Sequence, residues 1–289
     1  MVFDQLASRL PEAVMQPALT GDVEAVETSY KALSFMSPGD KNAILIGIAE
    51  CAAINLHVEL LEWCFAAGLD MPPNMTNTTL YHQAMDSRSL AIWEVLIRHG
   101  LDLNATYSEA CGDVFSEAVR EGNVELARFL LENGQDPNVA QGSSHQGFWE
   151  IGACALLGDK PSRAVEILND MLRHGWAQRP NKYQSGAAHI VAAKIGHLEA
   201  LKLLVEHGAD LDLAHNCNDW GGSEWDWYQD VTALFAAAYN GHEDAVAYLL
   251  EKGANPMLRD KRGYSCLWAA RKGGNEKVVS LIERSGVTE

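Results

Sequence analysis

A glycine closes a leucine-rich segment seven times along the 289-residue chain, at near-regular intervals. The segments before these glycines carry apolar residues at the helical i, i+3, i+4 spacing. Glycine suits the left-handed residue that ends a helix, because a Cβ is strained in that conformation. Self-similarity of this kind predicts a stack of structural repeats. The recurring residues are Gly68, Gly100, Gly134, Gly175, Gly208, Gly253 and Gly286, spaced 32, 34, 41, 33, 45 and 33 residues apart.

A second turn lies twelve residues before four of these glycines, at Gly122, Gly196, Gly241 and Gly274. It separates the leucine-rich helix from a shorter, alanine-rich one, and the alanines keep that helix slim enough for close stacking. One such helix pair cannot bury its own apolar faces, whereas stacked neighbours can. The sequence therefore predicts about eight helix-turn-helix units, which begin near residues 12, 47, 79, 113, 149, 187, 232 and 265.

These units resemble ankyrin repeats, whose consensus is T-P-L-H-x-A-A-x-x-G-H, then a longer helix, G-A-D and a β-turn. Thr232-Ala233-Leu234-Phe235 with Gly241-His242 is the best match, and Thr79–His82 and Ala187–Ile190 with Gly196-His197 are degenerate versions. The resemblance implies an all-α solenoid with β-turn fingers, formed by residues 1–289 as a single domain. It does not specify a function, because such solenoids host many.

The charge narrows the class of partner. The formal net charge is −17 and the isoelectric point is about 4.9, with no stripe of Lys and Arg. An acidic surface of this kind argues against nucleic acid and against bare association with anionic membranes. The six cysteines form no C-x-x-C pair and the N-terminus carries no signal peptide, which indicates reduced thiols in a cytoplasmic or nuclear protein.

Two intervals exceed the repeat length, by about eight residues before Gly175 and about twelve before Gly253. The second insertion, His215 to Asp230, enlarges a β-turn finger and contains Trp220, Trp225, Trp227 and Tyr228. Tryptophan and tyrosine are over-represented in binding hot spots. These aromatic residues either contact a partner or pack on the edge of the solenoid to anchor the loop, and the two roles are compatible.

In ankyrin repeats the two residues before the inter-helix glycine line the concave groove. At the corresponding positions in the middle of this chain the residues are mainly apolar, and aromatic residues enter from both insertions. An exposed apolar concavity usually marks a binding site; the alternative is that irregular repeats need these residues to fill packing gaps. The predicted binding residues are Phe148, Trp149, Leu156, Leu157, Ile195, Trp220, Trp225, Trp227, Tyr228, Tyr239 and Asn240.

Most of the ten histidines occupy repeat positions, and we predict no metal site and no cofactor. His189 stands where the consensus has leucine, which favours a buried, hydrogen-bonded histidine over a catalytic one. The carboxylates of the second insertion do not fit the EF-hand spacing. No established catalytic signature is present: the sequence lacks G-x-S-x-G, a P-loop, H-E-x-x-H and a G-x-G-x-x-G motif before a strand.

The leading hypothesis is a stand-alone binding module that holds a protein or peptide in its concave groove, centred on repeats five to seven. We expect no further effector domain beyond the repeats. The alternative is an unusual cofactor-free enzyme, of isomerase, cyclase or dehydratase type, that encloses a small apolar molecule. An open groove would favour a peptide, and a closed, dry pocket a small ligand. The catalytic candidates for the alternative are His189, Lys194, Glu224, Asp226 and Asp230.

Overall fold

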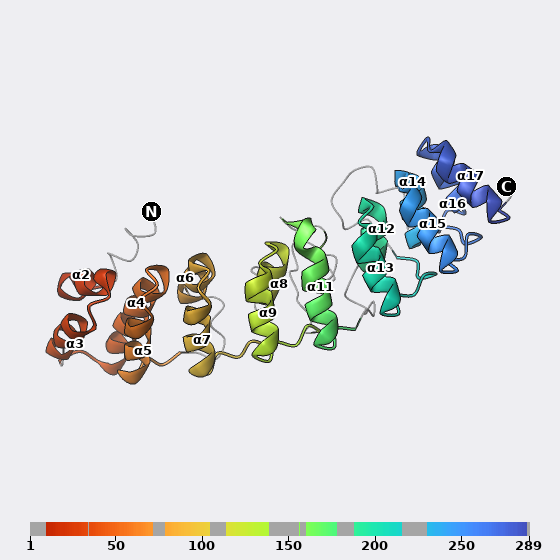
Figure 1. The fold of residues 1–289 in the computed structure, drawn as a ribbon. Helices are drawn as coiled ribbons and strands as arrows, with labels where there is room; N and C mark the ends of the chain where they lie inside the picture. Colours follow the sequence, from red (N-terminus) through yellow and green to blue (C-terminus); the bar gives the residue numbers. More distant parts are fainter. Residues whose placement is uncertain are drawn as a thin grey trace. The chain divides into compact units, whose positions relative to one another are not determined.

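The computed structural model describes residues 10–33, 35–71, 79–104, 114–138, 156, 160–177, 188–215 and 230–287. Within these ranges the chain is helical, and its only β-structure is two isolated bridges, His215 with Val231 and Arg259 with Ser265. Figure 1 shows the helices following one another as antiparallel pairs. The predicted all-α repeat fold is therefore confirmed. The chain divides into two compact units, residues 1–114 and 115–289.

The first unit contains three helix pairs. In each pair the first helix packs on the first helix of the next pair, and the second on the second, so that α2, α4 and α6 form one row and α3, α5 and α7 another. We call these the inner and outer rows. The helices are α2 (Glu12–Thr20), α3 (Val23–Ala32), α4 (Pro38–Ile54), α5 (Val58–Ala66), α6 (Thr79–Ser87) and α7 (Leu90–Arg98).

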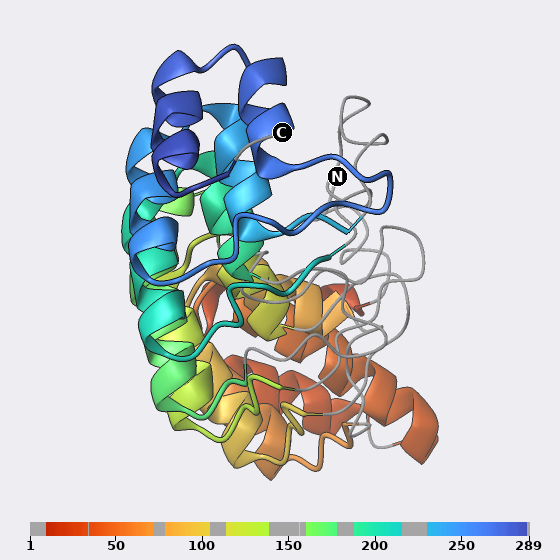
Figure 2. The same ribbon diagram turned by 90° about the vertical axis from the view of Figure 1, so that its right-hand side faces the viewer.

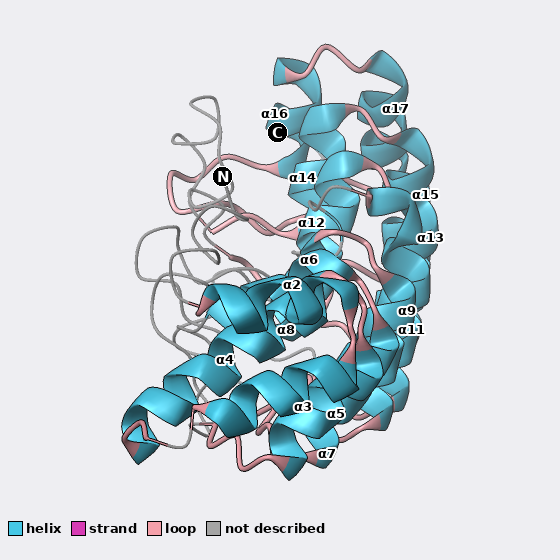
Figure 3. Cartoon of the chain, turned by 90° about the vertical axis from the view of Figure 1, so that its left-hand side faces the viewer, coloured by secondary structure: helices cyan, strands magenta, loops and turns pink. Residues whose placement is uncertain are grey.

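The second unit continues the pattern with pairs four to eight. Of the first helix of pair five, only Leu156 lies within the described residues. Figure 3 shows α13, α15 and α17 along one side with α12, α14 and α16 beside them, and Figure 2 shows the same stack from the other side. The elements are α8 (Val114–Arg120), α9 (Val124–Glu132), the 3-10 turn η1 (Pro161–Arg163), α11 (Ala164–Arg173), α12 (Ala188–Ile195), α13 (Leu198–Glu206), α14 (Ala233–Asn240), α15 (Glu243–Glu251), α16 (Cys266–Lys272) and α17 (Glu276–Arg284).

Small side chains let the inner helices approach one another closely. In α14 every residue from Ala233 to Ala238 is buried, and four of these six residues are alanine. Larger leucines such as Leu201 and Leu249 fill the space between the inner and outer rows. The core is thus a continuous layer between the rows, and each pair depends on its neighbours for burial.

A histidine ties one inter-helix turn to the turn before it. His57 Nε2 lies 3.0 Å from the carbonyl oxygen of Leu19, and His242 Nε2 lies 2.9 Å from that of Lys194. The ring can come this close because the preceding turn has glycine: a Cβ on Gly196 would lie 2.5 Å from His242 Nδ1. Each such bond contributes about 1 kcal/mol and fixes the stacking of consecutive pairs.

The closing glycines adopt the backbone that the sequence predicted. Gly208 and Gly253 follow their helices with φ angles of 87° and 93°. No atom lies within 4 Å of the place where a Cβ on Gly208 would stand. The requirement for glycine here is therefore a matter of backbone conformation and not of space.

We predict that Gly208→Val lowers the free energy of unfolding by roughly 1 kcal/mol or more, because valine is strained at a positive φ. Urea unfolding followed by circular dichroism measures the change. The matched control is Gly39→Ala in α4, where the backbone is helical and a Cβ meets no atom. It should be neutral or slightly stabilising, and coincident curves for Gly208→Val and wild type would contradict the C-cap assignment.

Two turns carry a side chain where other units have glycine. Leu56 and Arg88 adopt φ angles of 63° and 54°, and the Leu56 side chain is 52% exposed. A left-handed conformation costs a residue with a Cβ roughly 1–2 kcal/mol. These two turns therefore store strain in the first unit.

We predict that Leu56→Gly stabilises the first unit by about 0.5 to 1 kcal/mol, since relief of the backbone strain exceeds the entropy cost of glycine. Thermal melts of the two proteins give the comparison. The control is the neighbouring Asn55→Gly, where φ is −96°; it should destabilise the protein. A melting temperature for Leu56→Gly below that of wild type would show that the turn is not strained.

Candidate functional site

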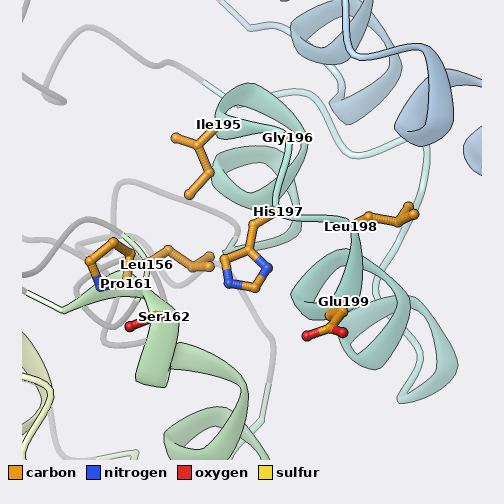
Figure 4. A pocket seen from close by; sticks show the side chains of 8 residues that line it. All are labelled: Leu156, Pro161, Ser162, Ile195, Gly196, His197, Leu198 and Glu199. Carbon is orange, nitrogen blue, oxygen red and sulfur yellow. The ribbon is translucent and has the colours of Figure 1, made fainter.

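A cavity of about 680 Å³ opens between the fifth and sixth helix pairs of the second unit. Figure 4 shows its walls, formed by η1 on one side and by the turn between α12 and α13 on the other. The cavity is open to solvent. It brings together two of the predicted binding residues, Leu156 and Ile195. The lining residues are Leu156, Pro161, Ser162, Ile195, Gly196, His197, Leu198 and Glu199.

The cavity has an apolar base and a polar rim. Leu156 is only 1% exposed, whereas Ile195, at the end of α12, is 36% exposed. The rim carries the hydroxyl of Ser162, the imidazole of His197 and the exposed carboxylate of Glu199. An apolar surface with a few polar groups at its edge is the usual composition of a binding site.

His197 differs from the histidines that tie other turns together. Its Nδ1 accepts a hydrogen bond from the backbone N–H of Ala200, at 3.4 Å. The neutral ring therefore carries its proton on Nε2, which is a donor. Within the described part of the chain no carbonyl accepts from this nitrogen, although His57 and His242 both donate to one. Figure 4 shows the ring turned toward the side of the cavity formed by Leu156 and Ser162.

The turn before α11 departs from the pattern of the other pairs. Pro161 begins the 3-10 turn η1, which leads into α11. Lys160 packs on the fourth pair in the place that a histidine takes elsewhere: a Cβ on Gly122 would lie 2.6 Å from Lys160 Cβ. The regular glycine–histidine contact is thus replaced where the fifth pair meets the fourth.

Two other predicted binding residues, Tyr239 and Asn240, lie at the end of α14, one helix pair further along. Tyr239 is partly buried and Asn240 is exposed. Asn240 Nδ2 donates to the Ala236 carbonyl of its own helix at 2.8 Å. Neither residue lines the cavity between pairs five and six.

The catalytic candidates within the described residues do not form one cluster. His189 begins α12 and is 3% exposed, while Lys194 is near the other end of that helix. Asp230 directly precedes Val231, which forms the isolated bridge with His215, and its carboxylate lies 2.6 Å from Lys261 Nζ. An eight-residue helix is about 12 Å long, which separates the two ends of α12.

His189 is buried, as its repeat position favours. Burial lowers its pKa to about 4, and the charge and backbone of Asp210 oppose the shift in part. Its Nε2 has no hydrogen-bond partner among the residues that the structure describes. The ring is therefore neutral at physiological pH and enclosed, which suits a structural histidine better than a general base.

The remaining predicted residues lie outside the described ranges: Phe148, Trp149, Leu157, Trp220, Glu224, Trp225, Asp226, Trp227 and Tyr228. The ends of the second insertion are described, because His215 and Val231 exchange backbone hydrogen bonds of 3.1 and 2.9 Å. Val231 directly precedes Thr232, the residue that caps the start of α14. Ile195, in contrast, is the last residue of α12, next to the inter-helix turn.

The sequence did not single out His197, Glu199 or Ser162 for the site. His197 was assigned to the regular glycine–histidine turn, and the sequence showed an irregularity near it only as the interval before Gly175, which is about eight residues longer than the repeat. Across the described residues, no group of three His, Cys, Asp or Glu side chains could hold a metal ion. No helix in the same ranges is both long and apolar enough to cross a membrane.

Comparison with known proteins identifies the repeats. Residues 155–260 and 190–287 match the family model "Ankyrin repeats (3 copies)". The fold is similar to the crystal structure of an ankyrin repeat domain from Acinetobacter baumannii, with a TM-score of 0.54 and 23% identity over 83% of this chain and 98% of that one. The chain is an ankyrin-repeat protein.

Its relatives are longer proteins that contain ankyrin repeats. The chain is 26% identical over 216 residues to the ankyrin repeat and KH domain-containing protein mask-1 of Caenorhabditis elegans, covering 75% of this chain and 7% of that protein. It is 40% identical over 76 residues to the ankyrin repeat and SAM domain-containing protein 6 of Mus musculus, which covers 26% of this chain and 7% of that protein. It is 24% identical to the ankyrin repeat and SOCS box protein 3 of Bos taurus, over 59% of this chain and 35% of that protein. The chain thus spans about a third of these relatives' length or less.

We predict that acidification destabilises the second unit through His189. The folded-state pKa of about 4 lies below the ordinary 6.5, so the unfolded chain binds this proton more tightly. The contribution of neutral His189 to the free energy of unfolding is complete above pH 6.5. It is lost as the pH falls toward 4, at about 1.4 kcal/mol per pH unit. Between pH 7.5 and 4.5, wild type should lose about 2 kcal/mol more stability than His189→Leu in urea unfolding. Equal losses would exclude His189 as the acid-sensitive group.

Proposed function

We propose that this chain is a binding module that holds a protein or peptide segment on the surface of repeats five to seven. Ankyrin repeats generally mediate protein–protein interaction. The observation that carries the proposal is the open cavity between pairs five and six, where Leu156 and Ile195 lie together. Its openness favours an extended segment over an enclosed small molecule, because an enclosing site buries most of a small ligand's surface.

The composition of the cavity supports the same conclusion. Leu156, Pro161 and Leu198 offer an apolar surface that an inserted side chain can cover, and the polar rim can fix the orientation of a backbone. Interfaces commonly combine such an apolar centre with a polar edge. In this proposal the aromatic residues of the insertion from His215 to Asp230 extend the contact over repeats six and seven.

The alternative, a cofactor-free enzyme, draws less support from the described residues. His189 is buried and neutral, Lys194 lies at the far end of the same helix, and Asp230 is paired with Lys261. A general base needs hydrogen-bond access to its substrate and a pKa near the working pH. The experiment that tests the proposal therefore measures binding of a peptide and not turnover of a substrate.

The test starts from peptides selected on the full chain from a display library with eight randomised positions. We predict that the triple variant Trp220→Ser, Trp225→Ser, Trp227→Ser or the single variant Tyr239→Ala weakens a selected peptide by tenfold or more, since a hot-spot residue contributes roughly 2 kcal/mol. Fluorescence anisotropy of the labelled peptide gives the affinity. The control is Phe35→Ser, an aromatic residue of the first unit that is 83% exposed.

Undiminished affinity in both variants, with melting temperatures unchanged, would contradict a binding surface on repeats six and seven. Loss of affinity in Phe35→Ser to the same degree would place the binding surface elsewhere. A melting temperature that falls in the tryptophan variant together with affinity would assign those residues to packing, because truncation of a buried tryptophan costs about 3 to 5 kcal/mol.

A further inference from the structure

We propose that the cavity between pairs five and six is a recognition site for a basic, apolar peptide segment. The segment inserts an aliphatic side chain against Leu156 and Ile195, offers a backbone carbonyl to His197 Nε2–H and places a Lys or Arg on Glu199. We call these residues, with Pro161, Ser162 and Leu198, the junction site. This inference rests on the proposed function and names the chemistry of the partner.

The hydrogen-bond requirement follows from the other junctions of the same chain. His57 donates to the carbonyl of Leu19 and His242 to that of Lys194, so this histidine position is built to meet a backbone carbonyl. At His197 the ring is held in the same tautomer by the N–H of Ala200. No carbonyl of the described residues takes its Nε2 proton. A partner backbone that supplies one would complete the pattern from outside.

The apolar requirement follows from the surface that remains uncovered. Ile195 is among the few large apolar side chains of the described chain that stay exposed, at 36%. It stands across from Pro161, with Leu156 at the base of the cavity (Figure 4). The volume of about 680 Å³ admits an aliphatic side chain together with the adjoining backbone. Covering this surface removes apolar area from water, which favours association.

The charge of the partner follows from Glu199, the acidic residue that lines the cavity. Glu125 and Glu166 share Arg163, at 3.2 and 3.1 Å. Glu243 pairs with Lys277 at 3.1 Å. Glu199 has no basic partner among the described residues, and it lines the cavity. With a chain net charge of −17, complementarity selects a cationic residue at this point.

The place of Glu199 gives the site a direction. Glu199 is the second residue of α13 and lines the cavity on that side. The basic residue of the partner is therefore expected on the α13 side of its aliphatic anchor.

The chain itself supplies a variant that separates binding from folding. Asn123 caps α9 at the position that His197 takes before α13, and its Oδ1 accepts from the N–H of Leu126 at 3.2 Å. In His197→Asn the amide oxygen can therefore keep the helix cap, while the Nε2 donor is lost. For the charge, Glu199→Lys has a matched control in Glu59→Lys, because Glu59 is the exposed second residue of α5 as Glu199 is of α13.

The experiment uses the selected octapeptides and the full chain. We expect the peptides to share an aliphatic residue next to Lys or Arg. Anisotropy should show affinity reduced about fivefold in His197→Asn, the value of one hydrogen bond, and tenfold or more in Glu199→Lys. Glu59→Lys should bind as wild type does. Raising NaCl from 50 to 500 mM should weaken binding to wild type but not to Glu199→Lys, because the salt screens the ion pair.

Several results would overturn the inference. Peptides that lose affinity in Tyr239→Ala or the tryptophan variant, but bind His197→Asn and Glu199→Lys normally, would reject the junction site and leave the proposed function intact. Failure of the chain to enrich any peptide over an uncoated support would reject both. A selected consensus rich in Asp and Glu would reject the charge assignment. If sedimentation shows that the wild-type chain is a dimer and that His197→Asn dissociates it, the occupant of the site would be a second copy of the chain.

Discussion

At two junctions of the stack, a histidine of one inter-helix turn donates to a backbone carbonyl of the turn before it. The contact needs two residues on different pairs: the ring of His57 or His242, and the glycine whose missing side chain lets the ring approach. Each pair buries its apolar faces only against its neighbours, so the spacing of pairs decides how well the core is filled. The alanine-rich inner helices, such as α14, make that spacing short.

The same contact explains where the surface becomes available to a partner. His197 caps α13 by accepting from Ala200 N–H, and no carbonyl of the described residues accepts from its Nε2. Two apolar residues, Leu156 and Ile195, line the cavity beside it. Where His57 and His242 donate to a carbonyl of the preceding turn, the histidine Nε2 is already bonded within the chain. Between pairs five and six, an apolar surface and the Nε2 donor of His197 lie together at the cavity.

The fold was predictable because its signals are local. A closing glycine requires a positive φ whatever surrounds it, and the backbone at Gly208 and Gly253 confirms the assignment. The site was predictable only in part. Apolar residues before a turn, Leu156 and Ile195, are visible in the sequence, whereas the position of the His197 ring beside the cavity depends on how pairs five and six stack. The lack of a basic partner for Glu199 among the described residues likewise depends on which side chains of other pairs come near.

Two histidines in the same helix pair illustrate why residue type alone does not locate a site. His189 breaks the consensus and so attracted the catalytic hypothesis, but α12 encloses it and burial lowers its pKa to about 4. His197 obeys the consensus, yet its ring lies at the surface beside a cavity. When a single side chain differs from the repeat consensus, neighbouring pairs can pack around it. When a turn differs in length, the backbone that the next pair contacts is displaced, and side-chain packing alone does not compensate for this. In a chain of stacked pairs, insertions are therefore the more informative guide to a binding surface.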